Sequence, residues 1–177
     1  MLYQICCDIC NVWKECIFRN LVITFVFVLG LAVPQYIICK KKNKPICWRQ
    51  WIHMGITLCY LFFVLELTLL GREDGSSTGV SLKIGGTYYP TIRSISFMIE
   101  NVLLFFPMGF LFPWTFQKLQ KFYKMFFLSF VLSLSIEVIQ LTTGRGFFQV
   151  DDILLNVLGA MLAYLLFSLG KYFGKYT

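Results

Sequence analysis

The chain has 177 residues, of which 58% are hydrophobic and only 14% are charged, and its mean hydropathy is +0.70. Soluble domains carry about 25% charged residues, so this composition excludes a soluble domain and predicts an integral membrane protein. The net charge of +7 comes from lysines and arginines grouped between apolar runs. That grouping is typical of membrane topology, with attraction to anionic lipids, and we predict no nucleic-acid partner.

Apolar runs long enough to cross a bilayer, about 20 helical residues each, recur along the whole chain. They lie at 17–39, 50–70, 95–113, 121–142 and 150–169. The sequence therefore predicts an all-α membrane protein, a bundle of about five transmembrane helices. A multi-pass protein of this kind is expected in the plasma membrane, and its oligomeric state is left open.

The segment before the first run is rich in cysteine: Cys6, Cys7, Cys10 and Cys16. Cys7 and Cys10 have the spacing of metal ligands or of a redox pair. No second such pair and no nearby histidine completes a zinc site. We therefore predict no metal and no cofactor, and expect this segment to lie along the membrane interface as a helix that continues into the first span.

Orientation follows from three segments that hold basic residues and no acidic ones, at 40–49, 114–124 and 170–177. Such segments stay in the cytoplasm. With five spans, the N-terminus is predicted outside and the C-terminus inside the cell.

The outer loop 71–94 is rich in glycine. Its stretch "SLKI", "GG", "TYY" has the two-residue turn of a β-hairpin between short strand-like runs. The loop is therefore either a short hairpin over the outer surface or a flexible linker.

Polar side chains of the last three spans gather in the half of the membrane next to this loop. A charge at the bilayer centre costs about 2.5–3.5 kcal/mol even on a permissive scale. Carboxylates at such depth must pair with Arg93 and Arg145, line a wet cavity, or both. The residues predicted to form an outward-facing polar pocket are Arg93, Glu100, Asn101, Glu137, Gln140, Arg145, Asp152 and Asn156.

Helical spacing supports convergence of these side chains. In the fourth span Ser129, Ser133, Glu137 and Gln140 step by three or four residues and share one face. In the fifth span one stripe carries Asp152, Asn156, Gly159 and Ala163. Small residues let helix backbones approach closely, so the two stripes are predicted to face each other. The alternative is that these residues only join or cap helices, with Asp151 as the N-cap of the last helix.

Three segments carry a resemblance to a known family: "MIENVLLFFPMGFLFP" at 98–113, "SLSIEVIQL" at 133–141 and "RGFFQVDDILLNVLGAMLAY" at 145–164. Together they resemble the VanZ-like family over residues 93–170. This divides the chain into an N-terminal part, 1–92, and a VanZ-like core, 93–170. The motif positions are Asn101, Pro107, Gly109, Glu137, Gln140, Arg145, Asp152, Asn156 and Gly159, of which Pro107, Gly109 and Gly159 are structural. One departure is Gln149, where many members carry an acidic residue.

The resemblance implies a role in resistance to the lipoglycopeptide teicoplanin. Its implied partners are membrane lipids, with the lipoglycopeptide itself or a cell-wall lipid precursor as ligand, bound or altered at the pocket. One alternative is an enzyme that acts on a lipid-linked or phospholipid substrate by carboxylate acid/base chemistry. A second is a small transporter component, which the apolar inner halves of the spans disfavour. No catalytic residue is assigned.

Overall fold

The computed structural model describes residues 19–30, 32–34, 36–37, 40, 48–71, 75, 77–85 and 92–174. Within them, four helices are long and apolar enough to cross a membrane: Trp48–Leu70, Ser94–Thr115, Phe122–Thr143 and Val150–Phe173. The first predicted span corresponds to a shorter apolar helix over residues 19–30 and 32–34. The predicted all-α membrane fold is confirmed, whereas the cysteine-rich segment lies outside the described residues.

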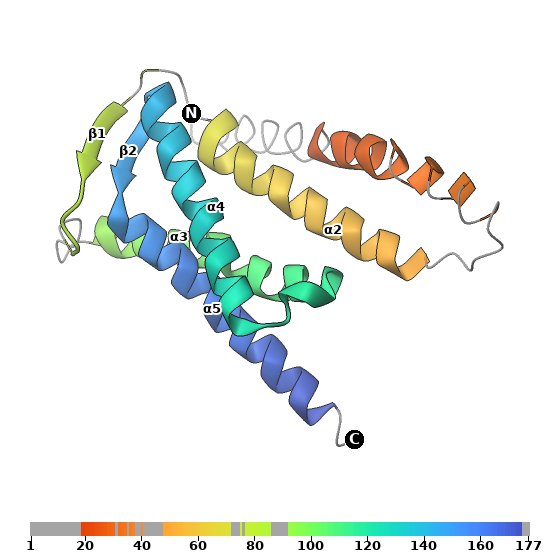
Figure 1. The fold of residues 1–177 in the computed structure, drawn as a ribbon. Coiled ribbons are helices and arrows are strands. Elements are labelled where there is room, and N and C mark those ends of the chain that lie inside the picture. Colours follow the sequence, from red (N-terminus) through yellow and green to blue (C-terminus); the bar gives the residue numbers. More distant parts are fainter. Residues whose placement is uncertain are drawn as a thin grey trace, which may run out of the picture. The chain divides into compact units, whose positions relative to one another are not determined.

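The chain forms two compact units, Met1–Glu66 and Leu67–Thr177. In the first unit, the helix over residues 19–30 runs beside α2 (Trp48–Leu65), as Figure 1 shows. Arg19 forms an ion pair with Glu66, where α2 passes into the π-helix η1 (Glu66–Leu70). A charged pair at this place gives each ion a partner at the polar end of two otherwise apolar helices.

The second unit is built on three long helices. Helix α3 (Ile92–Thr115) contains Pro107 and Pro113 and leads through the short 3₁₀ helix η2 (Gln117–Leu119) to α4 (Phe122–Thr143). Helix α4 ends at Gly144, whose φ of 67° is the left-handed conformation that glycine adopts without a steric penalty. Strand β2 (Arg145–Gln149) then leads directly into α5 (Val150–Phe173).

A two-stranded parallel ladder connects the loop after η1 to the start of α5. Strand β1 (Ser77–Ser81) pairs with β2 in the register Ser77 to Arg145 and Ser81 to Gln149, and Figure 1 shows the two strands side by side. The predicted hairpin put a strand at 81–84 followed by a Gly-Gly turn; the observed strand lies earlier, and its described partner is β2. The second half of that hairpin lies outside the described residues.

Helices α3 and α5 pack closely because glycines lie where they cross. A Cβ atom on Gly159 would overlap the backbone of Val102, and one on Gly109 would overlap the carbonyl oxygen of Ala160. This confirms a close backbone approach through the small residues of α5. The approach is made to α3, whereas the sequence pointed to α4.

Candidate functional site

The polar stripe of α4 faces the interior of the second unit. Ser129 and Ser133 are 0% exposed, Glu137 is 2% exposed and Gln140 is 4% exposed. The prediction that these four residues share one face is therefore confirmed. Burial of a carboxylate and an amide in an apolar bundle requires hydrogen-bond partners, and the structure supplies them from three directions.

The two acidic residues Glu137 and Asp151 each accept a hydrogen bond from a backbone amide, one at the junction of β2 and α5 and one in the loop after β1. The Gln149 N–H donates to Glu137 Oε2 at 2.9 Å, and the Gly85 N–H donates to Asp151 Oδ1 at 2.9 Å. The N-cap of α5 is Gln149, so the prediction of Asp151 as N-cap is wrong. Asp151 lies instead in the first turn, where a carboxylate interacts favourably with the helix dipole, and its side chain joins the loop after β1 to α5.

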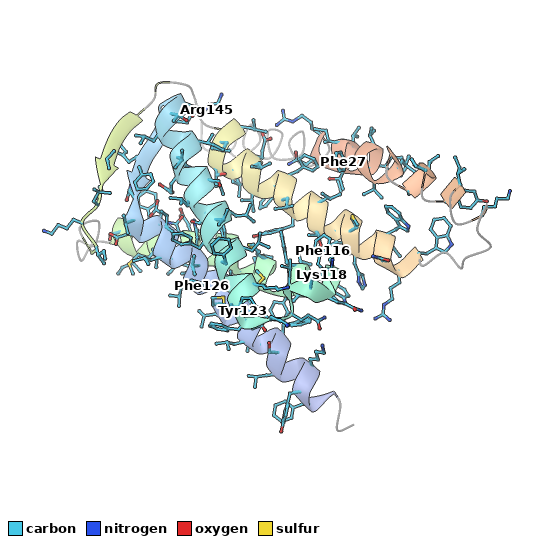
Figure 2. The ribbon with its side chains drawn as sticks, in the orientation of Figure 1. Phe27, Phe116, Lys118, Tyr123, Phe126 and Arg145 are labelled. Carbon is cyan, nitrogen blue, oxygen red and sulfur yellow. The ribbon has the colours of Figure 1, made fainter. Side chains whose placement is uncertain are left out.

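Gln140 and Arg145 bind the end of η1. Gln140 Nε2 donates to the Thr68 carbonyl at 2.9 Å, and Arg145 Nη1 donates to the Leu69 carbonyl at 2.9 Å. The last carbonyls of a helix have no partner within it, so these donors satisfy groups that would otherwise be buried unpaired. Figure 2 labels Arg145 just beyond the end of α4.

Two side-chain pairs join α5 to its neighbours in the bundle. Asn101 Nδ2 on α3 donates to Asp152 Oδ1 at 2.8 Å, and Asn156 Nδ2 donates to Ser133 Oγ on α4 at 2.9 Å. Asn156 lies one turn beyond Asp152, so a single face of α5 contacts both other helices. We call the following residues the polar cluster: Asn101, Ser133, Glu137, Gln140, Arg145, Asp151, Asp152 and Asn156.

Asn156 is the residue of this cluster with an unmet hydrogen bond. It is 3% exposed, and its Oδ1 has no hydrogen-bond partner among the described residues. Rotating the amide by 180° would exchange donor and acceptor and would still leave one polar atom without a partner. In either orientation one polar atom of Asn156 is available to a ligand beside Ser133, and in the orientation that the structure has it is the acceptor Oδ1.

The other residues predicted for the site have different places. Glu100 is exposed on α3, and its neighbour Asn101 makes the contact with α5. Arg93 lies in α3, but its side chain is outside the description. Pro107 lies within the same helix, and Gly109 and Gly159 form the α3–α5 crossing described above.

Several groups at the site are invisible to sequence reasoning because they belong to the backbone. The carbonyls of Thr68 and Leu69 and the N–H of Gln149 bind three of the predicted side chains, and the N–H of Gly85 binds Asp151, which was not predicted for the pocket. Their position depends on the fold and not on their side chains. The only sequence signal was the long loop that ends beside the predicted pocket.

These features define a multi-pass membrane protein with a network of buried polar side chains at one end of a three-helix unit. The chain belongs to the VanZ/LLP1 family, whose sequence profile matches residues 52–171. It is 35% identical over 117 residues to Protein VanZ of Enterococcus faecium, a match that covers 66% of this chain and 70% of that protein. No solved structure matches the chain.

Proposed function

We propose that this membrane protein contributes to tolerance of lipoglycopeptide antibiotics of the teicoplanin type by binding a cell-envelope lipid at the polar cluster. The family membership and the resemblance in the motif segments support the resistance role. The lipid is the proposed ligand because the cluster lies among membrane-spanning helices, where a headgroup can approach from the bilayer surface. Binding such a lipid would change how the drug's acyl chain or its target is presented at the membrane.

The observation that carries this proposal is the unpaired Oδ1 of Asn156. A buried polar atom without a partner costs about 1–3 kcal/mol, and helix packing alone would be served better by an apolar side chain of similar size. A ligand hydroxyl or amino group that donates to Oδ1 would remove this cost. Headgroups of envelope lipids and lipid-linked wall precursors carry such groups.

The alternative is that the polar cluster only holds the helices together. The contacts of Glu137, Gln140, Arg145 and Asp151 with backbone groups fit that role by themselves. The Asn156 and Ser133 pair separates the two hypotheses, because replacing both partners of a buried hydrogen bond by apolar groups is nearly neutral for stability.

The test is the double variant Ser133→Ala/Asn156→Leu, expressed in a host that is susceptible to teicoplanin. We expect the membrane-inserted protein to melt within a few degrees of the wild type and to lose most of its protective effect. The measurements are the inhibitory concentration of teicoplanin and the melting temperature in detergent. Vancomycin, a glycopeptide without the acyl chain, measures whether the effect depends on that chain.

The matched control is Ser129→Ala, which removes a hydroxyl of the same buried stripe one turn away. Ser129 Oγ donates to the Phe126 carbonyl of its own helix at 2.9 Å, so this variant should keep full protection. A double variant that folds and protects like the wild type would contradict the proposal and favour a purely structural cluster.

A further inference from the structure

The first unit contains a groove between the helix over residues 19–30 and α2, which run side by side in Figure 1. The groove has a volume of about 660 Å³, and its walls include Phe25 and Val28 from one helix and Ile56 and Phe63 from the other. This volume is within the range of about 300–1,000 Å³ that small-molecule sites occupy. The wall formed by the helix over residues 19–30 precedes the residues matched by the family profile.

Two polar side chains in the wall of this groove have hydrogen-bond donors without an acceptor. Asn20 is 5% exposed and Thr24 is 6% exposed. Neither Asn20 Nδ2 nor Thr24 Oγ1 has a hydrogen-bond partner in the part of the chain that the structure describes. The residues are four apart in a helix, so both lie on one face, and unmet donors in an apolar groove call for an acceptor from a ligand.

The depth of these donors in the membrane limits the chemical class of ligand that can reach them. Arg19 precedes Asn20 and forms an ion pair with Glu66, with 55% of the arginine side chain exposed. Arginines at the end of an apolar helix extend to the polar interface, which places this ion pair at the headgroup level. Thr24 lies about 7.5 Å further along the helix. The donors therefore lie between the headgroups and the hydrocarbon core.

We propose that the groove binds one acyl chain of a glycerophospholipid, with Asn20 Nδ2 and Thr24 Oγ1 donating to its ester carbonyl oxygen. An ester carbonyl is attached directly to an apolar chain, which matches two donors at one end of an apolar groove. A transmembrane helix from a second copy would fill the groove but would bring backbone carbonyls already bonded within that helix. This site is independent of the polar cluster, because the two lie in different units.

The probe is an equimolar mixture of a diacyl phosphatidylglycerol and its dialkyl ether counterpart, which has the same headgroup and chain length without ester carbonyls. The full-length chain in a maltoside detergent is equilibrated with the mixture, and retained lipid is counted by native mass spectrometry. We expect the diacyl lipid to be retained about five- to tenfold more often, the selectivity that one or two hydrogen bonds supply. Equal retention of the two lipids would overturn the proposal.

The variant Thr24→Val removes the hydroxyl with little change in shape and should reduce the preference for the diacyl lipid by about half or more. Asn20→Leu in addition should bring the ratio to about one. If the double variant inserts with a wild-type melting curve and keeps the wild-type ratio, the two donors do not select the lipid and the assignment fails.

A second pair of variants tests the groove itself. A Cβ atom on Gly55 would lie 3.8 Å from Val28 Cγ2, an ordinary contact, so Gly55→Leu should extend into the groove and lower total lipid retention severalfold. Gly30→Leu is the matched control, because a Cβ atom there meets nothing within 4 Å. Equal retention by the two variants would contradict the site. Displacement of the diacyl lipid by a lipoglycopeptide at equal concentration would also contradict the proposal, because the drug would then be the ligand of the groove.

Discussion

Gly159 and Gly109 determine how closely α3 and α5 approach each other, because each lies where a side chain would meet the backbone of the other helix. In a membrane, where lipid tails are as apolar as leucine, helices associate through such close packing and not through hydrophobic burial. The family motif glycine at 159 therefore has a direct steric role. Its neighbour on the same face, Asn156, adds the hydrogen bond to α4.

We predict that Gly159→Ala lowers the free energy of unfolding by about 2 kcal/mol, because the new methyl group has to displace the backbone at Val102. Thermal unfolding in detergent measures the effect. Gly170→Ala in the same helix is the control, since a Cβ atom there meets nothing within 4 Å. It should leave stability unchanged or raise it by up to about 1 kcal/mol through better helix propensity. Similar melting curves for both alanine variants would show that α3 and α5 are not in this contact.

A second prediction concerns Glu137, whose carboxylate accepts a hydrogen bond from the Gln149 N–H at 2.9 Å. Glu137→Gln keeps an acceptor of the same length, so it should change the unfolding free energy by less than about 1 kcal/mol. Glu137→Leu leaves the amide unpaired at the junction of β2 and α5 and should cost about 1–3 kcal/mol. Melting of the two variants in detergent measures the difference. A leucine variant as stable as the glutamine variant would mean that this bond does not hold the junction.

At the scale of elements, the ladder between β1 and β2 joins segments more than sixty residues apart in the sequence. It links the segment that follows η1 to the strand that precedes α5, and Asp151 binds the loop that follows β1. A two-stranded sheet is only marginally stable by itself. The side-chain contacts of Gln140, Arg145 and Asp151 with neighbouring backbone groups therefore complement it.

We predict that Val80→Cys/Phe148→Cys, made in a background without the native cysteines, forms a disulfide on mild oxidation. The two positions are register partners, and paired residues on adjacent strands have the Cα separation that a disulfide requires. The control Val80→Cys/Phe147→Cys places the second thiol on the opposite face of the strand. Gel mobility with and without reductant reports the bond, and equal yields from both pairs would contradict the parallel register.

Sequence periodicity was sufficient to predict the helices and insufficient to predict the two strands. Ser129, Ser133, Glu137 and Gln140 follow a helical period, so their common buried face could be read directly from the sequence. The residues 77–81 have no alternation of apolar and polar side chains, and their partner lies far along the chain, so local pattern pointed to the adjacent Gly-Gly turn instead.

The partners of Gln140 and Arg145 are backbone carbonyls, and no residue type marks those positions. Glu100 was included in the predicted pocket because it lies at the same depth as Asn101, although successive helical residues point about 100° apart.

On the scale of the whole molecule, the distribution of charge predicts an orientation. Basic residues without acidic neighbours occur at 40–49, 114–124 and 170–177. The last two segments flank the ends of α3, α4 and α5 that lie away from the polar cluster. Lysines and arginines of short loops are retained in the cytoplasm, so the cluster and the strand ladder should face the outer side. This is the orientation that the proposed function requires.

We predict that a single cysteine at position 43, introduced as Asn43→Cys into a background without the native cysteines, is inaccessible to a membrane-impermeant thiol reagent in intact cells. It should be labelled after the membrane is permeabilised. Lys83→Cys is the control on the opposite side, because Lys83 is exposed in the loop after β1 and should be labelled in intact cells. Both results follow if basic segments face the cytoplasm, because position 43 precedes α2 and Lys83 follows it, so the two positions are then expected on opposite sides of the membrane. Labelling of position 43 but not of position 83 from outside would show that the orientation is the reverse of the predicted one. The polar cluster would then face the cytoplasm, where an external lipoglycopeptide and an outer-leaflet lipid cannot reach it.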